Sequence, residues 1–210
     1  TLPEKTITMW VNMLEFPAEF AEFMSKSPSP GASGWFFYIQ NLNETIQLDQ
    51  SFTVALGSWR APLNLLFLNQ WIHIAVTYDA RDVANIPLFY IDGIIRETTT
   101  LIPPVGAQSS DNEGDMCMGQ LGATGGCGTT EPLGGILSDV RIFNRILSHP
   151  EIRSIYKGQH IRNGLLGYWP LLSKDSEERD FSSKGYSAHV VGALTANPHP
   201  GFSQPHLPIR

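Results

Sequence analysis

The chain has 210 residues, of which 42% are hydrophobic and only 16% charged, with 19 glycines and 15 prolines; these values are typical of one turn-rich globular domain. A formal net charge of -6 provides no basic surface for nucleic acid or anionic lipid, because both are bound largely through clustered Lys and Arg. No apolar stretch approaches the roughly 20 residues that cross a bilayer, so membrane insertion is not expected.

The first predicted strands lie in the N-terminal quarter of the chain. Residues 6–12 alternate apolar and polar side chains, residues 35–40 form an apolar run, and residues 45–48 and 51–56 predict a hairpin. The segment 25–34 between the first two strands is rich in Ser, Pro and Gly, which favours a surface loop.

The middle of the chain has the clearest strand pattern. Residues 71–79 predict a strand that places four apolar side chains on one face: Ile72, Ile74, Val76 and Tyr78. Residues 87–98 predict a hairpin, because Asp92-Gly93 tolerates the positive φ angles of a tight turn.

The last third of the chain predicts a strand, a helix and two further strands. Residues 135–144 alternate, with Ile136, Val140 and Ile142 on the expected core face. A short helix follows, because Ser148-His-Pro-Glu151 has the form of a capping box. Two more strands are predicted near residues 165–172 and 188–192, and the proline-rich segment 195–210 is expected to form a linker or a surface strap.

Two features concern covalent modification. Cys117 and Cys127 flank a Gly-rich stretch that can fold back, which favours a loop disulfide; the alternative is a pair of free thiols in a reducing compartment. Asn43 begins a glycosylation sequon, which matters only if the protein passes through a secretory pathway.

Four segments together resemble laminin G-like and pentraxin-like modules of the concanavalin A-like lectin and glucanase superfamily. These segments are residues 6–11, 69–79, 88–93 and 133–152. The resemblance implies an all-β fold, a two-sheet antiparallel sandwich of the concanavalin A-like jelly-roll type, with one short helix.

The chain departs from this family at its ends. Residues 164–171, followed by 180–185, resemble the segment that normally opens the domain, whereas here they close the chain. Either residues 1–194 form a circularly permuted sandwich that residues 164–194 complete, or residue 164 begins the next copy of a tandem array. The first explanation is favoured, because an unpaired Tyr168-Trp169 would expose apolar surface.

Catalytic motifs are missing from the sequence. The hydrolases of this superfamily resemble this fold but carry alternating acidic residues on a cleft strand, and no such run is present; the acidic cluster at 111–115 lies in a turn-like region. The six histidines are scattered, and neither a nucleophile elbow nor a phosphate-binding loop is found. We therefore expect no enzyme activity, with glycoside hydrolysis as the less favoured alternative.

Calcium is the one cofactor that the resemblance implies, because relatives hold it at the sandwich rim with Asp side chains and backbone carbonyls. Asp180 is the first candidate ligand, and Asp139 is expected nearby if the terminal segment pairs with its strand. Asp111 and Asp115 form the second candidate. The alternative interpretation is that these carboxylates only keep turns solvated.

Three aromatic residues flank predicted loops: Trp35, Phe36 and Trp59. They either stack on sugar rings or pack in the core, and core packing is favoured because aromatic side chains dominate sandwich interiors. No ligand-contact residue is assigned from the sequence.

The resemblance predicts a non-catalytic recognition or adhesion module, secreted or at the cell surface, that binds a glycan or an extracellular protein. The alternative is a structural spacer or assembly unit in a surface array, filament or viral coat, whose partners would be neighbouring copies.

Overall fold

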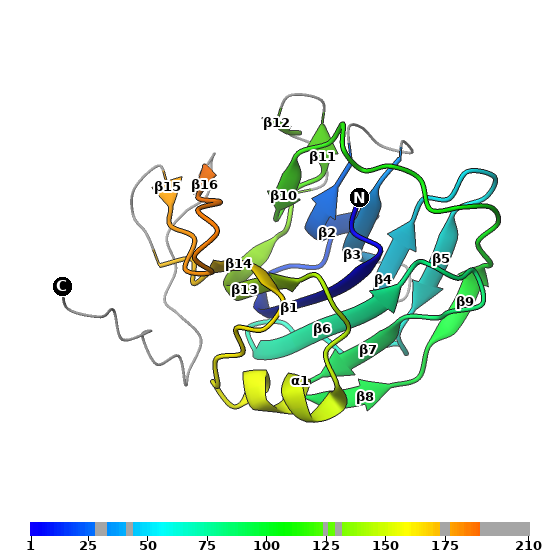
Figure 1. Cartoon of the computed structure of the whole chain (residues 1–210). Helices are drawn as coiled ribbons and strands as arrows, with labels where there is room; N and C mark the ends of the chain where they lie inside the picture. The colour runs from blue at the N-terminus through cyan, green and yellow to red at the C-terminus, as the bar shows by residue number, and fades with distance from the viewer. Residues whose placement is uncertain (28–32, 41–43, 124–125, 129–131, 173–176, 190–210) are drawn as a thin grey trace.

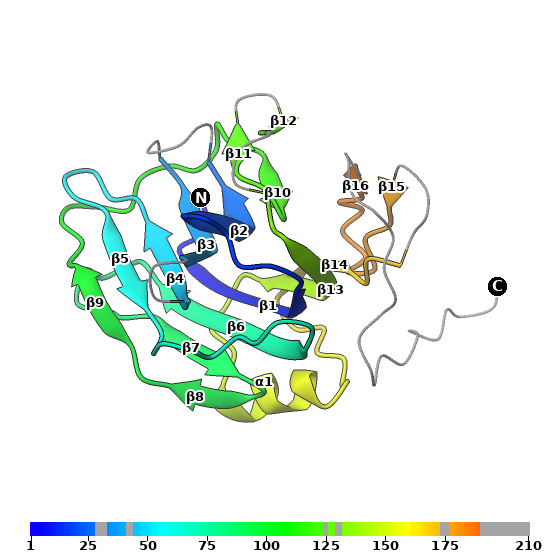
Figure 2. The ribbon, with the colours of Figure 1, turned by 180° about the vertical axis from the view of Figure 1, so that it is seen from behind.

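The computed structural model describes residues 1–27, 33–40, 44–123, 126–128, 132–172 and 177–189. Within these ranges the strands form two six-stranded antiparallel sheets, which pack as the two layers of a sandwich (Figures 1 and 2). One short helix, α1 (His149–Tyr156), accompanies them, and no helix of the described ranges is long and apolar enough to span a membrane. The predicted fold class is confirmed.

The first sheet has the strand order β14-β13-β1-β6-β7-β8. Its members are β1 (Glu4–Met13), β6 (Trp71–Asp79), β7 (Leu88–Ile91), β8 (Ile94–Arg96), β13 (Gly135–Phe143) and β14 (Leu165–Trp169). The second sheet has the order β10-β2-β3-β4-β5-β9. Its members are β2 (Phe20–Lys26), β3 (Trp35–Gln40), β4 (Thr45–Gln50), β5 (Gly57–Arg60), β9 (Thr99–Ile102) and β10 (Met116–Met118). Two short pairs lie outside these sheets: β11 (Gly122–Ala123) with β12 (Gly126–Cys127), and β15 (Glu177–Glu178) with β16 (Ala188–His189).

The hydrophobic core fills the space between the two sheets. The apolar face predicted for residues 71–79 is confirmed, because all four of its side chains belong to this core. Trp59 of the second sheet packs on Tyr78 of the first, with their ring centroids 4.7 Å apart. Gly57 permits this contact, because a Cβ atom there would lie 2.1 Å from the Trp59 ring.

A smaller cluster lies on the outer side of the first sheet, where α1 packs near β8 (Figure 1). Ile152 and Ile155 are its buried residues on the helix. The predicted helix start is confirmed, since the Ser148 N–H donates to Glu151 Oε2 over 2.8 Å. The predicted Asp92-Gly93 turn joins β7 to β8, and both residues have positive φ.

Two strand predictions in the second sheet are wrong. Residues 20–26 form β2, so Ser25 and Lys26 belong to a strand and not to the predicted loop. β4 pairs with β3 and with β5 at 57–60, and not with the segment 51–56, whose β contacts are the isolated bridges at Phe52 and Ala55.

The predicted core face of β13 is wrong at one end. Val140 and Ile142 are in the core, but Leu137, and not Ile136, packs against it. The cause is a bulge around Asp139, which has a φ of 54° and shifts the register with β1.

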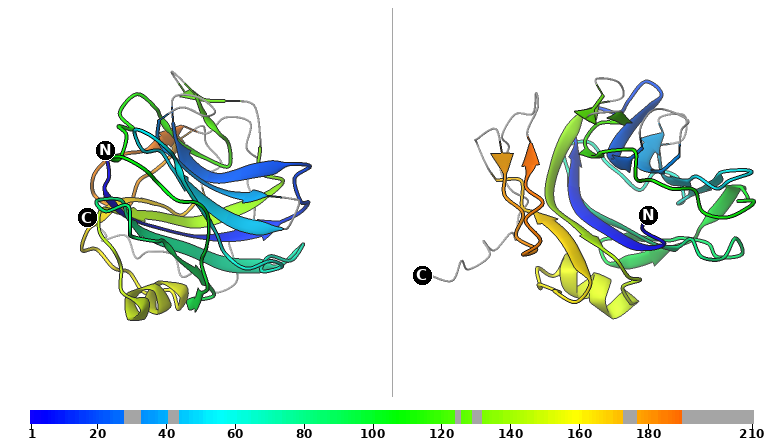
Figure 3. Two further views of the ribbon diagram at one scale, coloured as in Figure 1. Left: turned by 90° about the vertical axis from the view of Figure 1, so that its right-hand side faces the viewer. Right: turned by 45° about the horizontal axis from the view of Figure 1, so that its top comes forward.

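The C-terminal part of the described chain adds β14 to the edge of the first sheet, beside β13. Trp169 reaches the core with 1% of its surface exposed, and its Nε1 donates to the Tyr186 carbonyl over 2.8 Å. The β15–β16 pair stands next to β14, outside the two main sheets (Figure 3). Residues 190–210, with the predicted linker, lie outside the described residues. The two explanations for the chain end, a permuted sandwich that residues 164–194 complete or a next copy that begins at residue 164, both stay predictions.

Candidate functional site

One face of the second sheet combines polar and aromatic side chains. Strand β3 alternates, so that Trp35, Phe37 and Ile39 lie in the core while Phe36, Tyr38 and Gln40 point away from it. The strand registers place residues of β2, β4 and β5 beside these three. We call this surface the β3 face; its members are Phe20, Glu22, Phe36, Tyr38, Gln40, Thr45, Gln47, Asp49, Ser58 and Arg60.

Tyr38 lies at the centre of the hydrogen bonds on the β3 face. Its hydroxyl lies 2.9 Å from Gln47 Oε1 and 3.2 Å from Asp49 Oδ2, and both oxygens can accept a hydrogen bond from it. The Gln47 amide nitrogen donates in turn to Gln40 Oε1 and, over 3.1 Å, to Thr45 Oγ1. These hydrogen bonds, within β4 and between β3 and β4, fix the orientation of the ring and of the amide groups before any ligand arrives.

The β3 face is a partly desolvated environment for charge. Burial raises the pKa of Asp49, and hydrogen bonding with the hydroxyls of Ser58 and Tyr38 offsets part of that rise. Burial also raises the pKa of the Tyr38 phenol, and the negative charges of Asp49 and Glu22 add to the effect. Tyr38 is therefore a neutral donor over the whole physiological range.

Part of the β3 face is accessible. Phe20, Phe36, Tyr38, Gln40, Asp49 and Arg60 are all half-buried, whereas Glu22 and Gln47 are each only 2% exposed. The Phe20 and Tyr38 rings meet edge to face, with centroids 6.2 Å apart. The accessible surface thus offers aromatic rings together with amide, carboxyl and guanidinium groups, which can bind a ligand by stacking and hydrogen bonding.

Asp180 and Asp139, the first predicted rim ligands, both contact β14. The Asp180 carboxylate accepts the backbone N–H groups of Tyr168, Ser182 and Tyr186, at 3.0, 2.7 and 3.0 Å. Although burial acts to raise it, these hydrogen bonds lower the pKa of Asp180 overall. Asp139 is 3% exposed, and both of its oxygens accept from the Arg141 guanidinium. Both carboxylates therefore stabilise the fold through these contacts.

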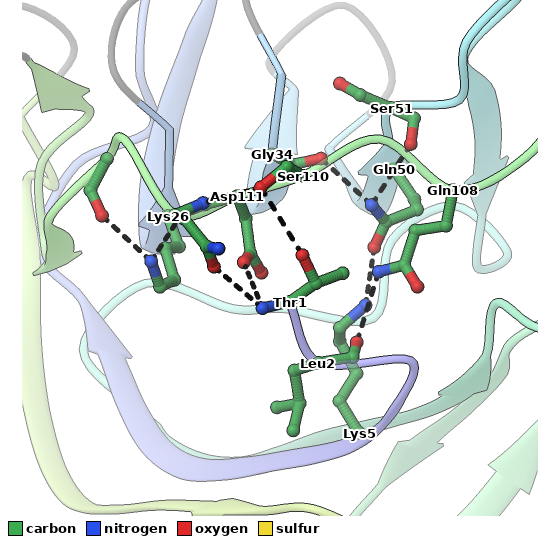
Figure 4. Close-up of polar contacts among 12 residues, drawn as sticks. Thr1, Leu2, Lys5, Lys26, Gly34, Gln50, Ser51, Gln108, Ser110 and Asp111 are labelled. Atoms are coloured by element: carbon green, nitrogen blue, oxygen red, sulfur yellow. Dashed lines mark hydrogen bonds and ion pairs between the residues drawn. The ribbon is translucent and has the colours of Figure 1, made fainter.

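Asp111 and Asp115, the second predicted pair, differ in exposure. Asp115 is exposed, whereas Asp111 is 1% exposed and lies 3.1 Å from the amino group of Thr1 (Figure 4). The Lys26 ammonium donates to the carbonyls of Asp111 and Gly114, which ties β2 to this loop. In the described part of the chain, no three His, Cys, Asp or Glu side chains are grouped in a way that could hold a metal ion.

The structure also places the predicted disulfide and the three aromatic residues that flank predicted loops. Cys117 and Cys127 form a disulfide with a Cα–Cα distance of 5.6 Å. Trp35 and Trp59 are fully buried in the core, whereas Phe36 lies on the β3 face. Asn43 is outside the described residues.

Sequence reasoning did not identify the β3 face. The available signal was the alternation within residues 45–49, where Thr45, Gln47 and Asp49 are separated by single apolar residues. Glu22 could not be found in this way, because β2 was not predicted.

The two layers, their curvature into a jelly-roll sandwich and the polar sheet face define a lectin-like sandwich domain. The family model of the concanavalin A-like lectin/glucanases superfamily, Laminin_G_3, matches residues 3–153, and the chain belongs to this family. The predicted resemblance to laminin G-like and pentraxin-like domains is confirmed. The comparison with curated proteins finds no match.

Several solved structures share the fold. A protein of Bacteroides ovatus ATCC 8483 described as carbohydrate-binding matches with a TM-score of 0.65 and 15% identity, over 95% of this chain and 56% of that one. This chain thus spans little more than half of that relative's length. A heptameric SAP-like pentraxin from Limulus polyphemus matches with a TM-score of 0.55 and 17% identity, over 77% and 73% of the two chains. The CBM40 of the Ruminococcus gnavus IT-sialidase, bound to α2,3-sialyllactose, matches with a TM-score of 0.54 and 14% identity, over 74% and 84%. At these identities the likeness shows the fold alone.

Proposed function

We propose that this chain is a non-catalytic, lectin-like recognition module that binds glycans on the β3 face. The observation that carries the proposal is the orientation of Tyr38 by Gln47 and Asp49 beside the half-buried ring of Phe36. Sugar rings present apolar C–H faces and hydroxyl groups together, so they match a surface that joins aromatic rings to fixed amide and carboxyl groups. The carbohydrate-binding proteins that share this fold support the same assignment.

The proposal is tested by binding to a glycan microarray, followed by titration of the strongest ligand in solution. Tyr38→Ala removes the central ring and its hydroxyl, and should weaken binding at least tenfold, as expected for a residue at the centre of a binding surface. Tyr186→Ala is the matched control, because the Tyr186 side chain is 60% exposed and its hydrogen bonds to Asp180 and Trp169 are made by backbone atoms. Equal affinity of the two variants would contradict the proposed site.

Lack of catalysis and extracellular location belong to the same proposal. Mass spectrometry of the bound glycan after long incubation should find it intact, whereas cleavage would favour the glycoside hydrolase alternative. The disulfide supports an oxidising compartment. Calcium binding stays a prediction, and it is tested by thermal unfolding with millimolar calcium and with a chelator.

An assembly unit is the second candidate function, and the edges of the two sheets favour it. All four residues of β9 are exposed, and the neighbouring edge strand β8 exposes Ile94 and Ile95. β9 carries no charged side chain, and an exposed, uncharged edge strand is a place where a further strand can pair. Mass measurement by light scattering over a wide concentration range tests this alternative, which requires association in the absence of glycan.

A further inference from the structure

The β3 face has more carboxyl groups than cationic groups. Glu22 and Asp49 lie on either side of Tyr38, because Glu22 pairs with Tyr38 across β2 and β3 and Asp49 lies within hydrogen-bond distance of its hydroxyl. Arg60 is the one cationic member of the β3 face. The lysine of β2, Lys26, does not add to it, because its ammonium donates to two backbone carbonyls of the loop 111–114, over 2.5 and 2.9 Å.

Burial strengthens the effect of these carboxyl groups. Glu22 is 2% exposed and Asp49 is half-buried, so water screens their charges less than it would on an open surface. The half-buried Asp49 carboxylate can accept hydrogen bonds from sugar hydroxyls, whereas a sugar carboxylate or sulfate has no proton to donate at neutral pH. An anionic ligand would therefore lose these hydrogen bonds and meet like charges.

The net charge of the whole chain also disfavours anionic ligands. The formal net charge of -6 slows the approach of anions at long range. Recognition of a carboxylate or sulfate typically uses clustered arginines in bidentate geometry, and the β3 face has a single arginine.

We infer that the β3 face selects neutral glycans and rejects glycans that carry a carboxylate or sulfate group on the bound sugar. This inference rests on the proposed function, and it narrows the ligand to one chemical class. It also separates this chain from the sialyllactose-bound module that shares its fold. Asp49 is the specificity-determining residue whose substitution disturbs the structure least, because an asparagine there can still accept a hydrogen bond from the Tyr38 hydroxyl.

The experiment uses an array in which each neutral oligosaccharide is paired with its sialylated and sulfated forms. The best neutral ligand and its charged partner are then titrated in solution against the wild type, Asp49→Asn and Asp82→Asn. Asp82 is the matched control, because it is exposed, lies in the turn after β6 and gives the same change of net charge. Circular dichroism checks the fold of each variant, and Glu22→Gln replaces Asp49→Asn if the latter is not folded.

We expect the wild type and Asp82→Asn to bind the neutral glycan at least tenfold more tightly than its charged partner. Asp49→Asn should reduce that ratio at least threefold, and a rise from about 50 to about 500 mM salt should reduce it as well. Equal or tighter binding of the charged partner would overturn the inference while leaving the proposed function intact, and would indicate that Arg60 reads the anion. An unchanged ratio in Asp49→Asn would overturn the role of Asp49, and failure to bind any glycan would overturn the proposed function itself.

Discussion

A buried lysine makes stability depend on pH in a direction that can be calculated. Lys5 of β1 is 0% exposed, and its ammonium donates to Gln50 Oε1. Burial lowers the pKa of Lys5 from its usual 10.5 to about 7, and the charges of Asp111 and Asp79 oppose this shift only in part. At a pH between these two pKa values the unfolded chain holds a proton on Lys5 that the folded chain has released, so the free energy of unfolding rises with pH.

The size of this effect follows from the shift. The slope is about 1.4 kcal/mol per pH unit in the middle of the window, which gives about 2 to 3 kcal/mol between pH values of about 7.5 and 9.5. Urea unfolding at several pH values should find this rise in the wild type and in Lys184→Met, which changes an exposed lysine. Lys5→Met should remove the rise. The same slope in Lys5→Met and the wild type would refute the reasoning.

Three further predictions concern the fold. Trp59→Ala leaves a cavity against Tyr78 and should lower the free energy of unfolding by about 3 to 5 kcal/mol in a urea titration; a loss below about 1 kcal/mol would contradict its core position. Asp180→Ala leaves three backbone N–H groups without their acceptor and should cost about 3 kcal/mol, with faster hydrogen exchange in β14 but not in β6. Because the pKa of Asp180 is lowered in the folded state, its stabilisation is present above the unfolded pKa of about 4 and is lost as pH falls through the folded value, so Asp180→Ala should flatten the acid limb of stability. The double change Cys117→Ala and Cys127→Ala opens a short loop and should cost about 3 kcal/mol, seen as a lower Tm; an unchanged Tm would count against the disulfide.

The strands that could be predicted are those whose two faces differ. Residues 71–79 alternate apolar side chains toward the core, and Asp92-Gly93 has the chemistry of its turn, so local sequence was sufficient. In contrast, β2 is buried on both faces and has a bulge between Glu22 and Met24, so no alternation remains in its sequence. The β5 strand is short and begins with a glycine, which is unusual in a strand. The reason for the glycine is the packing of the Trp59 ring against it, which the sequence does not show.

The candidate site could not be predicted for a related reason. Strand β3 has aromatic residues on both faces, so the sequence does not reveal that Phe36 and Tyr38 point outward while Trp35 points inward. The partners of Tyr38 come from other strands, and register between strands is not visible in a single sequence. The sequence predicts Asp139 as a calcium ligand, but its bidentate contact with Arg141 depends on the bulge that the structure reveals.

The central claim is that a glycan binds on the β3 face. It is tested most directly by nuclear magnetic resonance, in which backbone amide shifts of the labelled protein are followed while the best neutral oligosaccharide of the array is added. The account predicts that the largest shifts cluster in β3 and β4, at Phe36–Gln40 and Gln47–Asp49. Saturable shifts confined to another surface, such as the loop at 103–115 or the β15–β16 pair, would contradict it.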